Sequence, residues 1–388
     1  MTLLFCIIFL CIISLLFIIF KSKNLIISII SSILIVYIIL NPKLCIESTI
    51  SGSNLFFYKV FPSLFPFLIL INIIINCDGV YIYSKLLGRV LCPPLRVTEK
   101  CSLPLVVSAL CGYPLGAKYS CDLYERGDID YPTCQRLINI ASNAGPLFII
   151  GSVGTSMLQN PYAGYLLLIS NYISCIIIGL LTPNFNDLKY RYTKPKINTS
   201  PKNIGEVLKT SVDNSIKTCL NIAGFIILFS VLLNIIKNNT MFQTSLNNIC
   251  NIFSLDKNLI EGFILGLIEM TNGCYLISLS SVNLYVKLFT ISFLLCFSGF
   301  SVTSQVYSFT YKHNLNMKRY IKIKIFQGII GSIICILLYK IPMLNVSLNA
   351  FSRFNKTSHI QSNLLFLSLV IILILPIILY KTITKRKL

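Results

Sequence analysis

The sequence predicts an all-α polytopic membrane protein. Hydrophobic residues make up 55% of the 388-residue chain, only 12% of the residues are charged, and the mean hydropathy is +0.78. Soluble domains carry roughly twice that share of charge. A soluble protein of this size would also leave too much apolar surface in water. The composition therefore argues against a disordered chain, a disulfide-rich secreted scaffold and a soluble enzyme.

Apolar runs set the expected helices, because a helix needs roughly 20 mostly apolar residues to cross a bilayer. Two interrupted runs, 101–119 and 258–280, contain Gly, Pro, Thr or Asn, and we expect re-entrant helical hairpins there, with spanning helices as the alternative. The first run lacks a basic start and a small-residue cleavage site, so we expect a retained helix. The remaining prediction is about nine transmembrane helices, over 2–20, 24–40, 60–77, 137–158, 161–182, 216–237, 284–309, 323–343 and 363–380.

The basic residues predict the topology. The chain has 33 Lys and Arg against 13 Asp and Glu, a net charge of +20. If nine helices cross and the two interrupted runs do not, 25 basic residues fall on one side and 7 on the other, with Lys287 at a helix end. Cytoplasmic loops carry the excess of Lys and Arg. This places the N-terminus outside and the C-terminus inside, and it explains the net charge without a nucleic-acid partner.

The order of the runs repeats. A helix over 60–77, the interrupted run 101–119, a broken helix over 137–158 and a helix over 161–182 are followed by the same series over 216–343. The charge count gives the two series opposite orientations. An inverted repeat with discontinuous helices is typical of transporters, whose substrate site lies near the midplane. Chance similarity between two lists of helices is the other interpretation.

The run 101–119 contains Gly112, Tyr113, Pro114 and Gly116, followed by Lys118. Glycine and proline free backbone N–H and C=O groups, which persist in a membrane only against protein or a wet cavity. Freed amides at a helix start bind anions, and the lysine adds positive charge. A substrate-binding break is therefore expected, although a packing kink would use the same residues.

A second break is expected within 137–158, at Ser142, Asn143, Gly145 and Pro146. Proline lacks a donor and clashes with the preceding turn, and the asparagine amide can donate and accept hydrogen bonds. Ser142, Asn143 and the backbone at Gly145 are candidate substrate contacts. A simple proline kink is the other interpretation.

Glu269 is the most informative acidic residue, because it is placed deep in an apolar run while the other acids lie in joints or near segment ends. A carboxylate at that depth is costly and is tolerated where it meets a ligand, a proton or a cation. Thr271 and Asn272 follow it as further candidates. Pairing with Lys118 or Arg136 would be a purely structural role.

A polar stripe at Ser298, Gly299, Ser301 and Gln305 interrupts the run 284–309. These side chains can hydrogen-bond a solute or glue neighbouring helices together. We count them among the substrate-binding candidates.

The sequence does not favour catalysis or a metal site. The 15 cysteines are scattered without a C-x-x-C pair, and the two histidines, His313 and His359, lie far apart. There is no P-loop. We therefore expect no enzyme, no catalytic residue, no metal and no cofactor; a coupling ion, H⁺ or Na⁺, and the oligomeric state are left open.

The motifs resemble those of the sporulation integral membrane protein YlbJ (SpoVV) family, which carries the nucleoside-recognition Gate domain. The resemblance covers roughly 55–345. It rests on the segments 61–67 (FPSLFPF), 111–118 (CGYPLGAK), 135–137 (QRL), 142–151 (SNAGPLFIIG), 266–271 (GLIEMT) and 299–302 (GFSV) with Gln305.

The apolar runs, the charges and the resemblance together give a domain plan. It has two N-terminal helices (1–45), a first Gate-like repeat (46–182), a cytoplasmic linker (183–215), a second inverted repeat (216–345) and a C-terminal helix with a basic tail (346–388). The resemblance also implies movement of dipicolinate, a small planar dianion, from the mother cell toward the forespore across the outer forespore membrane. Lys118 and freed amides would then contact the anion, and Glu269 would bind a coupling proton or orient donors. A nucleoside or purine transporter and a non-transporting assembly factor of the spore envelope are the alternatives.

Overall fold

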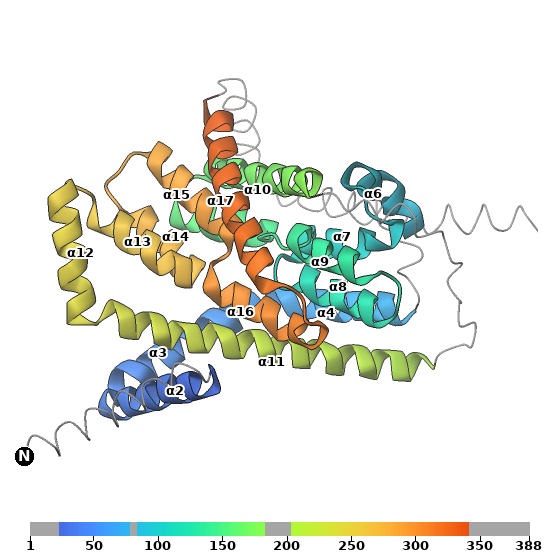
Figure 1. The fold of residues 1–388 in the computed structure, drawn as a ribbon, viewed down its shortest axis with the longest axis horizontal. Coiled ribbons are helices and arrows are strands. Elements are labelled where there is room, and N and C mark those ends of the chain that lie inside the picture. The colour runs from blue at the N-terminus through green and yellow to red at the C-terminus, as the bar shows by residue number, and fades with distance from the viewer. Residues whose placement is uncertain (1–22, 78–83, 183–202, 341–388) are drawn as a thin grey trace, which may run out of the picture.

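The computed structural model describes residues 23–77, 84–182 and 203–340 (Figure 1). Within these ranges every regular element is a helix and none is a strand. The prediction of an all-helical protein is therefore confirmed for the described residues. The expected helices over 2–20 and 363–380 and the basic tail lie outside them.

The N-terminal part is more helical than predicted. Helix α2 (Lys23–Leu40) is followed after Asn41 by α3 (Pro42–Leu55), a π-helical turn η1 (Phe56–Val60) and α4 (Phe61–Asn76). The axis bends by 106° between α2 and α3. Proline tolerates the first turn of a helix, so α3 starts at Pro42. Helix therefore also runs through residues 42–59, between the apolar runs expected over 24–40 and 60–77.

A hairpin and an interrupted helix occupy the next part of the chain. Its elements are η2 (Ser84–Gly88), α6 (Arg89–Leu95), η3 (Glu99–Cys101), α7 (Ser102–Cys111), α8 (Leu115–Glu125), α9 (Tyr131–Ile140), the π-helical η4 (Leu147–Met157) and α10 (Pro161–Leu181). Residues 141–145 between α9 and η4 are not helical. The predicted break within 137–158 is confirmed, although the first half of that helix already starts at Tyr131.

The second half begins with a 34-residue helix, α11 (Ile204–Lys237). It starts at Ile204 because the Asn203 side chain accepts a hydrogen bond from the Gly205 amide at 2.9 Å. The expectation of a linker reaching residue 215 is therefore wrong. The chain continues through α12 (Thr240–Phe253), α13 (Lys257–Ile268), α14 (Met270–Leu279), α15 (Leu284–Phe297), α16 (Gly299–Thr310), η6 (Tyr311–His313) and α17 (Met317–Tyr339).

Two stretches of the described chain share one order of elements. Each has a pair of helices joined by a short break, then a helix interrupted midway, then a continuous helix. The first stretch is α7–α8, α9–η4 and α10, and the second is α13–α14, α15–α16 and α17. Helices α7 and α8 contact each other, as do α13 and α14, so both pairs are hairpins.

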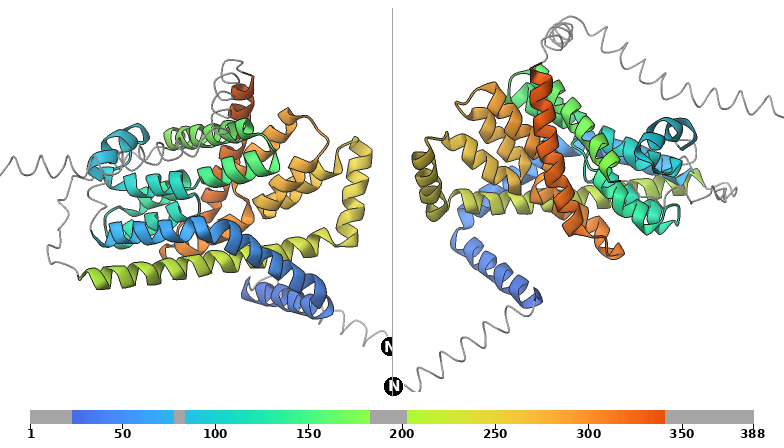
Figure 2. Two further views of the ribbon diagram at one scale, coloured as in Figure 1. Left: turned by 180° about the vertical axis from the view of Figure 1, so that it is seen from behind. Right: turned by 45° about the horizontal axis from the view of Figure 1, so that its top comes forward.

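The helices pack around a few long rods (Figures 1 and 2). Helix α11 runs along one side of the molecule and contacts α3 and α4, while α12 stands nearly perpendicular at its end. Helix α17 crosses the middle and packs on α15 and α10. The halves of the chain therefore interlock rather than forming two separate bodies.

The lengths of the apolar helices support a multi-pass membrane location. In the described residues α10, α11, the stretch Leu284–His313 and α17 are each long and apolar enough to cross a membrane. The bent pair Ser31–Leu40 and Pro42–Tyr58 raises the number from four to five. Leu64–Asn76 and Leu147–Met157 are apolar but shorter. Nine crossings and their orientation remain predictions for the whole chain.

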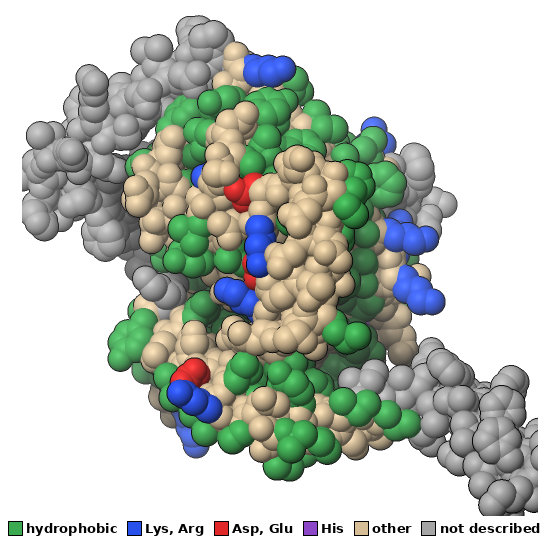
Figure 3. Space-filling view, turned by 90° about the vertical axis from the view of Figure 1, so that its left-hand side faces the viewer, with side chains coloured by type: hydrophobic (Ala, Val, Ile, Leu, Met, Phe, Trp, Pro, Cys, Tyr) green, Lys and Arg blue, Asp and Glu red, His purple; other side chains and the backbone are tan. Residues whose placement is uncertain are grey.

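The exterior agrees with contact to lipid. Large apolar side chains are exposed along α2, α10, α11 and α17, including Ile39, Leu181, Leu220 and Phe326. Figure 3 shows one face on which hydrophobic side chains are widespread and charged side chains are few and scattered. Exposed apolar surface on this scale is stable only against hydrocarbon or another apolar surface.

Glycines allow the hairpin helices to approach closely. A Cβ added at Gly273 of α14 would lie 2.7 Å from the carbonyl oxygen of Gly262 in α13. Gly266 of α13 packs directly against Gly273. Small residues at such positions let backbones approach within membrane proteins, where packing drives helix association.

Gly273→Ala is expected to destabilise the protein, because the new methyl group must push the two arms of the α13–α14 hairpin apart. Overpacking of this kind costs about 1–3 kcal/mol. Thermal unfolding of the detergent-purified protein measures the effect. Gly224→Ala is the matched control, since a Cβ there meets no atom within 4 Å. Equal melting temperatures for the two variants would contradict the packing argument.

Candidate functional site

The tip of the first hairpin lies against the break in the α9–η4 helix. Gly112 adopts φ +86°, and the Tyr113–Pro114 peptide bond is cis, between α7 and α8. A Cβ at Gly112 would approach the Gly145 amide nitrogen to 2.6 Å. The Tyr113 amide donates to the Asn143 carbonyl oxygen at 2.7 Å. The structure therefore brings the two predicted breaks of the first half together.

The break itself is held by hydrogen bonds. The backbone amide of Asn143 donates to the Ser108 hydroxyl at 3.2 Å. The Asn143 side-chain amide donates to the Ile140 carbonyl at 3.0 Å, the C-terminal end of α9. The hydroxyl groups of Ser142 and Tyr320 are 2.8 Å apart. Ser142 and Asn143 are buried, so these contacts satisfy polar groups that water does not reach.

Glu269 forms the break of the second hairpin. It has extended backbone angles between α13 and α14, and its side chain caps α14. The carboxylate accepts from the amides of Thr271 and Asn272, both at 2.9 Å, and from the Asn272 side chain at 2.8 Å. Its hydrogen bonds are therefore made within its own helix start. The alternative of a pair with Lys118 or Arg136 is not what the structure shows.

The second interrupted helix breaks at Ser298 and Gly299, as the sequence predicts. Both residues have positive φ, +73° and +74°. A Cβ at Gly299 would lie 3.2 Å from the carbonyl oxygens of Gly266 and Ile268, at the end of α13. The tip of the second hairpin therefore lies against the second break, as the first tip lies against the first. Ser298, Ser301 and Gln305 are buried.

The two halves meet at their hairpin tips. The Tyr113 hydroxyl contacts the Met270 sulfur, which joins the start of α8 to the start of α14. Helix α16 contacts α8, and η4 contacts α14. Each half therefore places the second part of its broken helix on the other half's hairpin. The four predicted interruptions form one contiguous cluster in the interior.

The predicted site residues do not include the cation at this cluster. Lys324, at the start of the helix expected over 323–343, lies in α17 with 0% of its surface exposed. Its ammonium group donates to the Ser142 carbonyl oxygen and, at 2.7 Å, to Oε1 of Gln327. The Gln327 amide donates to Oδ1 of Asn143 at 3.1 Å. A stripe at helical spacing, Tyr320, Lys324, Gln327, Gly331 and Cys335, was the available signal.

Three other predicted residues have structural contacts. Lys118 pairs with Asp122 at 3.1 Å, one turn along α8. Arg136 donates to the carbonyl oxygens of Leu95, Arg96 and Gly179, so it caps neighbouring helix ends. Gly116 packs against the Ala141 carbonyl group, where a side chain would not fit.

A second carboxylate is more buried than Glu269. Glu261 of α13 is 5% exposed, whereas Glu269 is half-buried. The Gln243 side chain donates to it at 3.4 Å. Glu261 lies near the start of α13, as the sequence places it, and α12 contacts this helix.

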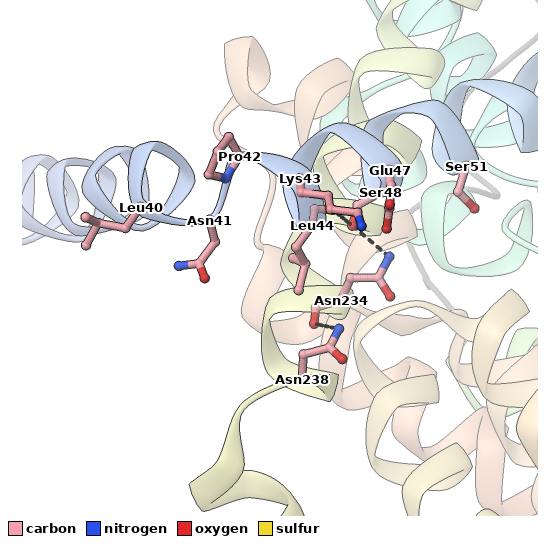
Figure 4. Close-up of a pocket in the computed structure, with 10 residues that line it drawn as sticks. All are labelled: Leu40, Asn41, Pro42, Lys43, Leu44, Glu47, Ser48, Ser51, Asn234 and Asn238. Carbon is pink, nitrogen blue, oxygen red and sulfur yellow. Dashed lines mark hydrogen bonds between the residues drawn. The ribbon is translucent and has the colours of Figure 1, made fainter.

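A hollow of about 680 Å³ lies elsewhere, where α2 meets α3 and α11 (Figure 4). Asn234 donates to the Ser48 hydroxyl at 2.9 Å and Asn238 donates to the Asn234 carbonyl at 2.9 Å. The hollow contains none of the predicted site residues. Its lining consists of Leu40, Asn41, Pro42, Lys43, Leu44, Glu47, Ser48, Ser51, Asn234 and Asn238.

The apolar helices and the interior cluster of helix breaks define a multi-pass integral membrane protein. The chain is 28% identical over 325 residues to the sporulation integral membrane protein YlbJ of Bacillus subtilis (strain 168), and the match covers 78% of this chain and 79% of the relative. This similarity supports a relationship to the YlbJ family and a membrane role in sporulation. No protein-family model matches the chain. No solved structure is significantly similar to it.

Glu269→Ala is expected to lower the stability of the protein by about 1–2 kcal/mol, because it removes the N-cap of α14. Glu269→Asp is expected to stay close to the wild type, since aspartate is a favoured cap. Thermal unfolding of both purified variants measures the difference. If Ala and Asp destabilise equally, the carboxylate does not cap the helix as drawn.

Proposed function

We propose that the protein is a permease for a small organic anion, dipicolinate, which it moves out of the mother cell toward the forespore. One observation carries the proposal: both hairpin tips and both helix breaks lie together in the interior of a membrane protein. Irregular backbone at membrane depth persists where it lines a solute or water pathway. The YlbJ relative, a sporulation protein, supports the biological setting.

The proposed architecture is an inverted repeat. The two stretches share one order of elements, and the basic residues of the sequence favour opposite orientations for them. Transporters built this way bind their solute between discontinuous helices and work by moving one part against another. The proposed location is the mother-cell-derived outer forespore membrane.

The conformation described here is closed around the proposed site. Ser142, Asn143, Ser298 and Gln327 are buried, and Tyr113 bridges to Met270 across the tips. Alternating access then requires a hairpin tip to withdraw from its break. The contacts to be opened include the Tyr113–Asn143 and Asn143–Ser108 hydrogen bonds and the packing of Gly112 and Gly299.

The proposal includes no catalytic step, no metal and no organic cofactor. A coupling ion is compatible with Glu269, whose carboxylate lies at the second tip. The residues that contact the solute are proposed from both breaks: Ser142, Asn143 and Gly145 from the first, and Ser298, Gly299 and Ser301 from the second.

Purified protein in liposomes is expected to accumulate labelled dipicolinate and not labelled nucleoside. Glu269→Gln is expected to reduce the initial rate at least about tenfold, because a neutral amide cannot accept all three donors that the carboxylate accepts and the second tip is then misplaced. Glu206→Gln, a matched change at an exposed position of α11, is expected to transport normally.

Two results would contradict the proposal. Uptake of nucleoside in place of dipicolinate would favour the nucleoside transporter. Absence of uptake of either solute by folded wild-type protein would favour an assembly factor.

A further inference from the structure

Lys324 is a buried basic side chain in a candidate membrane-spanning helix. It lies in α17 between Tyr320 and Gln327, and none of its surface is exposed. A charged side chain at such a position is costly and is typically associated with function.

The hydrogen-bond partners of Lys324 are neutral. They are the Ser142 carbonyl oxygen and the Gln327 side-chain oxygen. Among the residues that the structure describes, no Asp or Glu forms an ion pair with it. A buried charge without a counter-charge is strongly unfavourable, so an anion that enters the site would be stabilised.

The surroundings supply further donors. An ammonium group has three N–H donors, of which two have partners here. The amide of Gln327 and the hydroxyl groups of Ser142 and Tyr320 lie next to it and can reorient toward an acceptor. A carboxylate is the ligand group that accepts from several such donors at once.

The cluster is also joined to the first hairpin tip. Lys324 binds Ser142, Gln327 binds Asn143, and the Asn143 carbonyl accepts from Tyr113 at the first hairpin tip. Withdrawal of that tip would therefore uncover the amide and the cation together. If Lys324 only capped the C-terminal end of α9, its hydrogen bond to the Ser142 carbonyl would be enough. The hydrogen bond between Gln327 and Asn143 would then not be required.

We propose that Lys324, with Gln327 and Asn143, is the carboxylate-recognition subsite of this protein. The inference rests on the proposed permease function and adds the group that distinguishes an anion from a neutral solute. The charge on Lys324 selects a carboxylate, and the amides orient it.

The test compares binding of dipicolinate with binding of its uncharged analogue, pyridine-2,6-dicarboxamide, by calorimetry on purified full-length protein. The wild type is expected to prefer the dianion. Lys324→Met is expected to weaken dipicolinate binding about 10- to 100-fold, the range for loss of a charged hydrogen bond, and to abolish the preference over the diamide. Lys322→Met, at an exposed position two residues earlier on α17, is the matched control and is expected to bind normally.

A second neutral variant distinguishes loss of carboxylate recognition from loss of folding. Lys324→Gln keeps an N–H donor for the Ser142 carbonyl, and it is expected to fold while losing the preference for the dianion. Each variant is first compared with the wild type by thermal unfolding without ligand. A structural role would lower that melting temperature and leave the ratio of the two affinities unchanged.

The outcomes separate the two proposals. Wild-type protein that binds neither compound would overturn the permease function. If the wild type binds dipicolinate and a folded Lys324 variant binds it equally well, the subsite is wrong and the permease remains. If the wild type binds the diamide as tightly as the dianion, the subsite is overturned without any variant.

Discussion

The need to satisfy interrupted backbone in an apolar interior governs this structure. Each helix break leaves N–H and C=O groups without intrahelical partners, and an unpaired group in hydrocarbon costs several kcal/mol. Here the breaks satisfy one another. The first tip donates to the first break through Tyr113 and Asn143, and Gly299 at the second break packs on the carbonyl end of α13. The breaks are therefore stable only where they meet.

This constraint also concentrates polar chemistry at one place. Helix ends carry partial charges, positive at the amide end and negative at the carbonyl end. The structure places a charged side chain at one end of each kind. The Glu269 carboxylate caps the amide end of α14, while Lys324 binds a carbonyl oxygen just beyond the end of α9. Both arrangements follow the helix dipole, which favours anions at amide ends and cations at carbonyl ends. The difference is that Glu269 accepts several hydrogen bonds from its own helix start, whereas Lys324 has neutral partners and no ion pair with an Asp or Glu of the described residues.

The positions of the breaks could be predicted, and the contacts between them could not. Gly112, Pro114, Asn143 and Ser298 interrupt apolar runs, and each falls at or beside a helix end in the structure. The partners of the breaks were harder to predict, because the sequence alone does not distinguish the basic residues Lys118, Arg136 and Lys324. Lys118 reaches Asp122 along its own helix and Arg136 reaches carbonyl groups of two other helices. Only the packing of α17 against α9 and α10 shows that Lys324, and not Lys118 or Arg136, contacts the first break.

The sequence by itself determined the solvent in which the chain folds. Its apolar runs are long enough to require lipid, and glycine and proline inside them interrupt helices whatever their neighbours are. Tertiary structure alone decided which interruptions meet and which charge they enclose. A break frees backbone groups locally, but their partners come from other helices: the Ser142 carbonyl accepts from Lys324, 182 positions away, and the Asn143 carbonyl accepts from the Tyr113 amide at the first hairpin tip. Those distances are closed by helix packing, which depends on shape across the whole interior rather than on any local pattern.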